Sequence, residues 1–329
     1  MGEFELLAKL RERLPPDGPR VKVGSGDDAA ITVPTGATAT SVDAIVEGVH
    51  FRRDGAGLET VGRKALSTAL SDLAAMGAEA GEAYIVLGAP PDLGESGFLE
   101  LLEGLLEVAE RTGTTLAGGD VTRAPALTLA VTVVGHAAAL EDLITRGGAE
   151  PGDLLVVTGE LGGAAAGRLL LEDSALAAAV STATAQDLRR RQLDPVPRLR
   201  SGQALAAAGA RAMIDLSDGL AGDAGHIAGA SGASLRIDAG SLPLASGVAE
   251  IAAAAGADPL RLAVSGGEDY ELLAALPPAK LDEAVARLGE AGETTLTPIG
   301  EVASGEGVEV RLPGGERLEA WGHDHFGQG

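Results

Sequence analysis

The sequence predicts an α/β (α+β) protein with two domains, because strand-like and helix-like segments alternate along its 329 residues. Hydrophobic residues make up 45% of the chain, which is enough for a full core. Aromatic residues make up only 2%, so we expect a core of Ala, Leu, Val and Ile. A turn-forming stretch near 138–150 predicts the boundary between an N-terminal domain, 1–140, and a C-terminal domain, 141–329.

The N-terminal half alternates between helical and extended apolar patterns. Pro15 and Pro16 end the first helix, and Gly113 ends a later one. Helices are expected at Glu3–Leu14, Leu58–Met76 and Glu95–Thr112. Strands are expected at Ala37–Val46, Ala83–Leu87, Thr114–Ala117 and Leu127–Gly135, with a turn at Gly118-Gly119-Asp120.

The C-terminal half repeats the alternation with more strands. The Pro195 and Pro197 pair breaks one helical segment. Helices are expected at Gly163–Leu171 and Gly219–Ala230. Strands are expected at Leu154–Thr158, Ala212–Leu216, Leu235–Ile237, Leu260–Val264, Glu271–Ala275, Thr297–Val302 and Val308–Leu312.

Charge and cysteine content limit the function classes. The formal net charge of −23 disfavours nucleic acid and anionic membranes as partners. The absence of cysteine excludes disulfides, thiolate metal sites and thiol nucleophiles. The first residues do not resemble a signal peptide, and apolar runs such as Ala124–Val134 are too short or too polar to span a bilayer. We therefore expect a soluble, cytoplasmic protein.

Aspartates in unusual places are the most informative feature. Asp43 lies inside a predicted strand, where Asp is depleted, and Asp72 lies on an apolar helix. Asp27 and Asp120 follow glycines, so ordinary turn formation is an alternative for them. Buried carboxylates need cations or hydrogen-bond donors, and sets of oxygen ligands suit Mg²⁺ beside phosphates. The candidate carboxylates are Asp28, Asp43, Asp72, Asp120, Asp215 and Asp218.

The usual phosphate-binding motifs are missing from the sequence. Neither a phosphate-binding loop of the G-x-x-x-x-G-K-[ST] type nor a protein-kinase signature occurs. The only lysines are Lys9, Lys22, Lys64 and Lys280, and none follows a glycine-rich turn. If the chain binds ATP, we expect metal ions, backbone N–H groups and arginines to hold the phosphates.

Several stretches taken together resemble the thiamine-monophosphate kinase family, within the superfamily of aminoimidazole ribonucleotide synthetase and selenophosphate synthetase. The resemblance covers nearly the whole chain in the family's order. The matching stretches are Gly24–Ala30, Ser41–Phe51, Leu70–Gly77, Gly118–Asp120, Ile214–Gly219, Ser265–Leu272 and Asp324–Phe326. The first two and the run Ser265–Leu272 are specific for the kinase branch, whereas the Asp motifs alone indicate only the superfamily.

The resemblance implies a two-domain synthetase-superfamily fold. In the family, the N-terminal sheets of two subunits pair into a barrel in a homodimer, and the C-terminal domain is mixed α/β. ATP and thiamine monophosphate meet between the domains, with several Mg²⁺ ions along the phosphates. The substrate phosphate attacks the γ-phosphoryl group directly, a reaction that needs positioning and charge neutralisation.

The resemblance also assigns residues. Metal positions match Asp28, Ser41, Val42, Asp43, Asp72, Asp120, Asp215 and Asp218. ATP contacts match Gly119, Asp120, Arg146 and Ser217, and substrate contacts match His50, Glu268 and Trp321. Val42 stands where relatives often have Thr. If that Thr binds a metal through its side chain, one ligand is lost here, whereas a backbone carbonyl would serve with either residue. His50 as a backbone-bonded strand-end residue is the alternative for that position, and a structural role is favoured for His226.

Other activities remain as alternatives. The absence of cysteine argues against a selenophosphate synthetase, and the motifs of His50 and Glu268 argue against the purine enzyme. A metal-dependent phosphatase would also use clustered Asp residues and Mg²⁺. A non-catalytic nucleotide-binding protein should lack several of the carboxylates, all of which are present here.

Overall fold

The computed structural model describes residues 8–292 and 295–318, which form two compact units. The first unit contains residues up to 73 and residues 78–141. The second contains residues 74–77 and the chain from 142 onward. Both units combine helices with a sheet, and this confirms the mixed α/β, two-domain fold class.

A four-stranded sheet in the order β3-β6-β4-β5 forms the first unit. Its strands are β3 (Ala37–Val46), β6 (Thr128–Ala137), β4 (Glu79–Ala89) and β5 (Thr115–Arg123). Only the β4–β5 pair is parallel. A separate two-stranded ribbon joins β1 (Val21–Val23) to β2 (Ile31–Thr32).

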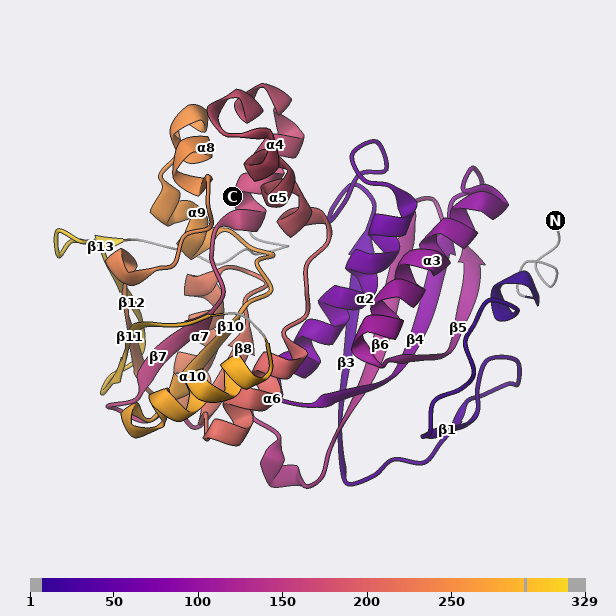
Figure 1. Ribbon diagram of the computed structural model, residues 1–329, viewed down its shortest axis with the longest axis horizontal. Coiled ribbons are helices and arrows are strands. Elements are labelled where there is room, and N and C mark those ends of the chain that lie inside the picture. Colours follow the sequence, from indigo (N-terminus) through magenta and orange to yellow (C-terminus); the bar gives the residue numbers. More distant parts are fainter. Residues whose placement is uncertain (1–7, 293–294, 319–329) are drawn as a thin grey trace. The chain divides into compact units, whose positions relative to one another are not determined.

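Two long helices, α2 (Leu58–Ala75) and α3 (Gly94–Thr112), cover one face of this sheet (Figure 1). Their apolar faces supply buried leucines such as Leu66, Leu70 and Leu101. The other face carries exposed Val42 and Val86, with 66% and 46% of their surfaces accessible. The sheet therefore alternates between buried and accessible positions, as expected for one covered face.

A seven-stranded sheet in the order β13-β12-β9-β11-β7-β10-β8 forms the second unit. Its strands are β7 (Leu154–Thr158), β8 (Ala212–Asp215), β9 (Ser234–Asp238), β10 (Leu272–Leu276), β11 (Leu296–Ala303), β12 (Gly307–Arg311) and β13 (Arg317–Leu318). All residues of β8 and β10 are buried, so both faces of this part of the sheet are covered.

Helices of the second unit pack on this sheet and on one another (Figure 1). They are α4 (Gly163–Glu172), α5 (Thr182–Leu193), α6 (Leu199–Ala208), α7 (Leu220–Ser231), α8 (Val248–Ala255), α9 (Pro259–Ser265) and α10 (Leu281–Glu290). Short 3-10 turns lie at Leu140–Asp142, Ser174–Ala179, Ala239–Ser241 and Pro278–Lys280. No helix in the described part of the chain is both long and apolar enough to cross a membrane.

Two sequence expectations were wrong. The segment Leu260–Val264 is helical rather than extended, because Asp258 accepts a hydrogen bond from the Leu260 N–H and Pro259 occupies the first helical position. A short apolar run is compatible with the periodicity of a helix or of a strand, and here the N-cap at Asp258 favours the helix.

The second error concerns Gly118-Gly119-Asp120, which continues strand β5 instead of forming a turn. A bulge in the β4–β5 pair precedes this segment. A Cβ atom on Gly119 would lie 2.1 Å from the Ile85 carbonyl oxygen, so glycine allows the backbone to approach its neighbour strand. The expected first helix is described only from residue 8, and its residues Glu3–Leu7 lie outside the described part.

The crossing of α4 and α5 gives a stability prediction. A Cβ atom on Gly167 would lie 2.0 Å from the Leu188 carbonyl oxygen, so Gly167→Ala must push α5 away. Overpacking of this kind costs about 1–3 kcal/mol, which exceeds the gain of up to about 1 kcal/mol in helix propensity. Gly167→Ala should therefore lower the free energy of unfolding, measured by urea denaturation.

The matched control is Gly229→Ala in α7, where a Cβ atom would meet nothing within 4 Å. This variant should be as stable as the wild type or gain up to about 1 kcal/mol. Equal stability of both variants would contradict the close crossing of α4 and α5.

Candidate functional site

In the first unit, strand β3 contributes two polar side chains on the helix-covered side of the sheet, Ser41 and Asp43. The neighbouring helix α2 contributes a third, Asp72. The Ser41 hydroxyl donates a short hydrogen bond to Asp72 Oδ2, joining strand and helix. Asp43 lies two residues further along β3 on the same side, and its Oδ1 accepts the Ala44 N–H at 2.7 Å. All three side chains offer oxygen atoms as possible metal ligands, and such ligands suit a hard cation such as Mg²⁺.

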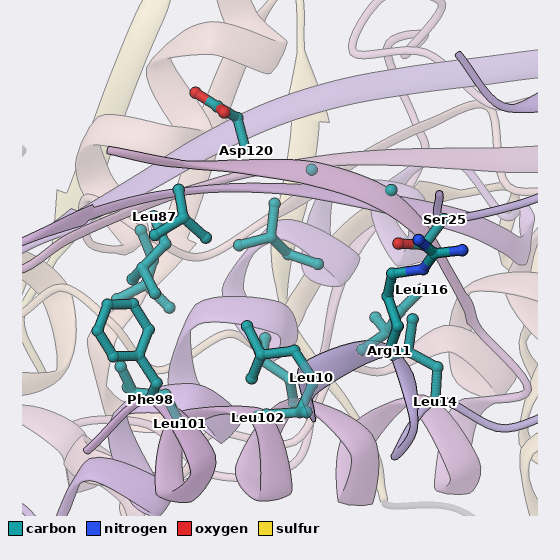
Figure 2. Close-up of a pocket in the computed structure, with 16 residues that line it drawn as sticks. Leu10, Arg11, Leu14, Ser25, Leu87, Phe98, Leu101, Leu102, Leu116 and Asp120 are labelled. Carbon is teal, nitrogen blue, oxygen red and sulfur yellow. The ribbon is translucent and has the colours of Figure 1, made fainter. Parts of the chain in front are cut away.

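Asp28 and Asp120 are both exposed but belong to different parts of the first unit. The Asp28 N–H donates to Asp27 Oδ1 at 2.8 Å, so Asp27 orders the loop that carries Asp28. Asp120 projects from β5 on the side away from the leucines of α3 (Figure 2). Strands β3 and β5 are the two edges of the sheet, so Asp43 and Asp120 are separated by three strand spacings, about 14 Å.

An apolar pocket of about 130 Å³ lies beneath β5 in the first unit. Leu87, Phe98, Leu101 and Leu116 line it, and Arg11 lies at its margin near Ser25 (Figure 2). Gly119 also borders the pocket, which places this predicted ATP contact between an apolar space and the exposed carboxylate of Asp120.

His50 is fixed in the turn that follows β3. Its Nδ1 accepts the Val46 N–H at 3.1 Å, so the backbone contact considered from the sequence is present. The Nζ of Lys64, a residue of α2 that is 1% exposed, donates to the His50 carbonyl oxygen at 3.3 Å. The turn is therefore tied to the helix that also carries Asp72.

In the second unit, two loops that are far apart in sequence are held together. Strands β8 and β10 pair in antiparallel fashion, with Asp215 opposite Leu272. Beyond the strands, the Glu268 N–H donates to the Ser217 carbonyl oxygen, and the Tyr270 N–H donates to that of Leu216, both at 2.9 Å. The predicted residues Asp215, Ser217, Asp218 and Glu268 thus meet at one end of this strand pair.

Asp223 and His226 extend this cluster from α7. Asp223 is 2% exposed, and its Oδ2 accepts the Asp218 N–H at 3.1 Å. Burial raises the pKa of Asp223 to about 8, and the charges of Asp215 and Asp218 add to the effect. Ligand atoms of Asp218, Asp223 and His226 lie within 4.8 Å of one another, so nearby cations would relieve the repulsion.

The turn that carries Glu268 is strained. Glu268 and Tyr270 have φ angles of 67° and 49°, which cost non-glycine residues about 1–3 kcal/mol each. Asp269 between them accepts the N–H groups of Gly162 at 2.7 Å and Ala164 at 3.1 Å. Burial raises the pKa of Asp269 to about 7, although these two donors favour its charged form.

Glu271, at the end of the same turn, is held by a buried ion pair. Its two carboxylate oxygens accept from Arg198 Nη2 at 2.6 Å and Nε at 2.9 Å, and Thr158 Oγ1 donates at 2.7 Å. Burial raises the pKa of Glu271, and the Arg198 guanidinium opposes that rise. Gln192 of α5 donates a short hydrogen bond to Glu268 Oε2.

The remaining predicted residues lie elsewhere. Arg146 is exposed on the segment before β7, where its carbonyl oxygen accepts from Ser231 Oγ at 3.4 Å. Trp321 lies outside the described residues. Sequence reasoning missed Asp223, Gln192, Arg198 and the role of Asp269. Asp269 lies inside the recognised run Ser265–Leu272, whereas no local pattern identifies Gln192 or Arg198.

Comparisons with known proteins agree on one family. The family model described as AIR synthase related protein, N-terminal domain, matches residues 26–137, and its C-terminal counterpart matches residues 150–313. A thiamine-monophosphate kinase of Mycobacterium tuberculosis is 40% identical over 83% of this chain and 80% of its own length. The Escherichia coli O157:H7 enzyme of the same name is 37% identical over 99% of this chain and 98% of its own.

Solved structures give the same result. The crystal structure of thiamine-monophosphate kinase from Stenotrophomonas maltophilia K279a is 35% identical, covers 97% of this chain and 98% of its own, and superposes with a TM-score of 0.84. A structure described as AaThiL complexed with AMPPCP and TMP is 30% identical over 99% of this chain and 97% of its own, with a TM-score of 0.76. The chain belongs to the thiamine-monophosphate kinase family.

Proposed function

We propose that this protein transfers the γ-phosphoryl group of ATP to thiamine monophosphate, giving thiamine diphosphate and ADP. The observation that carries the proposal is the backbone hydrogen bond that joins Ser217 to Glu268. The resemblance of the sequence motifs assigns Ser217 to the nucleotide and Glu268 to the acceptor. The complex of the relative AaThiL with AMPPCP and TMP supports both substrates.

We further propose that several Mg²⁺ ions accompany the phosphates. Bound Mg²⁺ neutralises phosphate charge and orients the reacting oxygens. The metal would be held by Asp28, Ser41, Asp43, Asp72, Asp120, Asp215, Asp218 and the backbone carbonyl of Val42. The ordered pair of Ser41 and Asp72 and the repelling pair of Asp218 and Asp223 support this set.

The reaction is a direct in-line displacement. A phosphate oxygen of thiamine monophosphate forms a bond to the γ-phosphorus as the bond to the bridging oxygen of ADP breaks, and ADP leaves with the electron pair. In this proposal His50, Glu268 and Trp321 bind the acceptor, while Gly119, Asp120, Arg146 and Ser217 bind ATP. The chain's role is to position both phosphates, so no covalent enzyme intermediate is needed.

The accessible face of the first sheet supports a homodimer. Val42, Thr132 and Tyr84 lie in one row across β3, β6 and β4, and exposed Val86 extends this apolar surface. Both edge strands, β3 and β5, also have unpaired backbone groups within the described unit. A second copy would cover the face and pair the edges. We place the activity in the cytoplasm, where ATP is available.

The first prediction of this proposal concerns the reaction itself. Protein incubated with γ-labelled ATP and thiamine monophosphate should form labelled thiamine diphosphate when Mg²⁺ is present, and chelation should abolish the transfer. Asp218→Asn should lower turnover by about 100-fold or more with a nearly unchanged melting temperature, because it removes a carboxylate that would hold the metal.

Asp282→Asn is the matched control, since Asp282 is exposed on α10. It should leave turnover unchanged. Label released as free phosphate would favour the phosphatase alternative. Normal turnover of Asp218→Asn would remove that residue from the metal set.

The positions of Asp43 and Asp120 predict how two subunits contribute to each active site. Because Asp43 and Asp120 lie at opposite edges of one sheet, we propose that each active site takes Asp43 from one subunit and Asp120 from the other. Homodimers of Asp43→Asn and of Asp120→Asn should each be nearly inactive. Mixed dimers purified with two affinity tags should recover about half of the wild-type turnover, because one of their two sites contains no substitution.

Sites built within single chains give a different result. Each site of a mixed dimer would then contain one substitution, and activity would stay as low as in the homodimers. Size-exclusion chromatography with light scattering should first establish the dimer, and a monomeric active enzyme would refute the proposal.

A further inference from the structure

The turn at Glu268–Tyr270 needs an anchor. Among the described residues, Glu268 and Tyr270 are the only non-glycine residues with a positive φ angle. They flank Asp269, so the strain lies on both sides of a single side chain. A conformation of this kind persists only where the surroundings enforce it.

Backbone contacts fix the ends of the turn but leave its middle to the side chain of Asp269. The N–H groups of Glu268 and Tyr270 donate to the carbonyl oxygens of Ser217 and Leu216. The two oxygens of Asp269 accept the N–H groups of Gly162 and Ala164, at the N-terminal end of α4. Both donors precede or begin a ten-residue helix, so the helix dipole adds to the attraction for the carboxylate.

The same helix pair also orients the neighbouring carboxylate. Gln192 of α5 donates to Glu268 Oε2, and α5 packs against α4 at Gly167. Asp269 therefore connects the turn to α4, and Gln192 connects the Glu268 side chain to α5. Because α4 and α5 pack against each other, both contacts attach the turn to one pair of helices. Movement of the turn relative to α4 would change where the Glu268 carboxylate points.

We propose that Asp269 is a positioning residue that holds Glu268 in its substrate-binding conformation, and thereby sets the affinity for thiamine monophosphate more than the affinity for ATP. This inference rests on the proposed function. It assigns Asp269 no contact with either substrate.

The test compares KM values in Asp269→Asn, which keeps the side-chain volume but points an amide group at the two N–H donors. The KM for thiamine monophosphate should rise about tenfold or more, while the KM for ATP stays within about twofold of the wild type. Asp258→Asn is the matched control, because Asp258 caps α9 with an equivalent bond to the Leu260 N–H and should change neither KM.

Coupling to Glu268 distinguishes positioning from general stabilisation. If Asp269 acts through Glu268, adding Asp269→Asn to Glu268→Gln should raise the KM for thiamine monophosphate by less than about threefold. Independent, multiplying effects would overturn the proposal. So would a lower melting temperature of Asp269→Asn with both KM values unchanged.

A second variant at the same position tests the proposal if Asp269→Asn does not fold. Asp269→Ser keeps a hydroxyl oxygen but has no amide NH2 group facing the N–H donors, so it should show an intermediate KM for thiamine monophosphate. If neither variant folds, Asp269 is a folding residue and the positioning role is refuted. A wild-type protein that does not phosphorylate thiamine monophosphate would refute the proposed function itself, whereas an active wild type with an unaffected Asp269→Asn would refute only the role of Asp269.

Discussion

The antiparallel pairing of β8 with β10 is the contact on which the site of the second unit depends. It places Asp215 opposite Leu272, so the segments that leave these two strands emerge side by side. Both strands are fully buried, and a shift of one residue would turn every side chain to the other face. The apolar core therefore fixes the register, and the register brings the loop of Ser217 to the turn of Glu268.

Buried carboxylates determine how these segments are held. A carboxylate removed from water needs donors or cations, and the second unit supplies them in different ways. Asp269 accepts two backbone N–H groups, Glu271 accepts the Arg198 guanidinium and a hydroxyl, and Asp223 accepts one N–H beside two other carboxylates. Asp223 lies beside the charges of Asp215 and Asp218, and burial together with these charges raises its pKa to about 8. A cation bound near Asp218 would therefore stabilise the charged form of these carboxylates.

The sequence predicted most elements because their local signals agree with the fold. Strand β3 and the helices α2 and α3 lie where the apolar periodicity placed them, within about a residue. Helix α9 was mistaken for a strand because five apolar residues fit both periods, and the strand at Gly119 was mistaken for a turn because close backbone approach also selects glycine. Local patterns alone could not place Gln192 against Glu268, since that contact depends on how α4 and α5 cross.

The run Glu268-Asp269-Tyr270-Glu271 also shows why a recognised motif does not by itself assign roles. Its polar residues face three different surroundings: Gln192 beside Glu268, the start of α4 beside Asp269, and Arg198 beside Glu271. Of these residues, only Glu268 is a predicted substrate contact. Asp269 and Glu271 instead hold the strained backbone that carries Glu268. We therefore expect a change at Asp269 or Glu271 to alter the geometry of the site without removing a contact with the substrate.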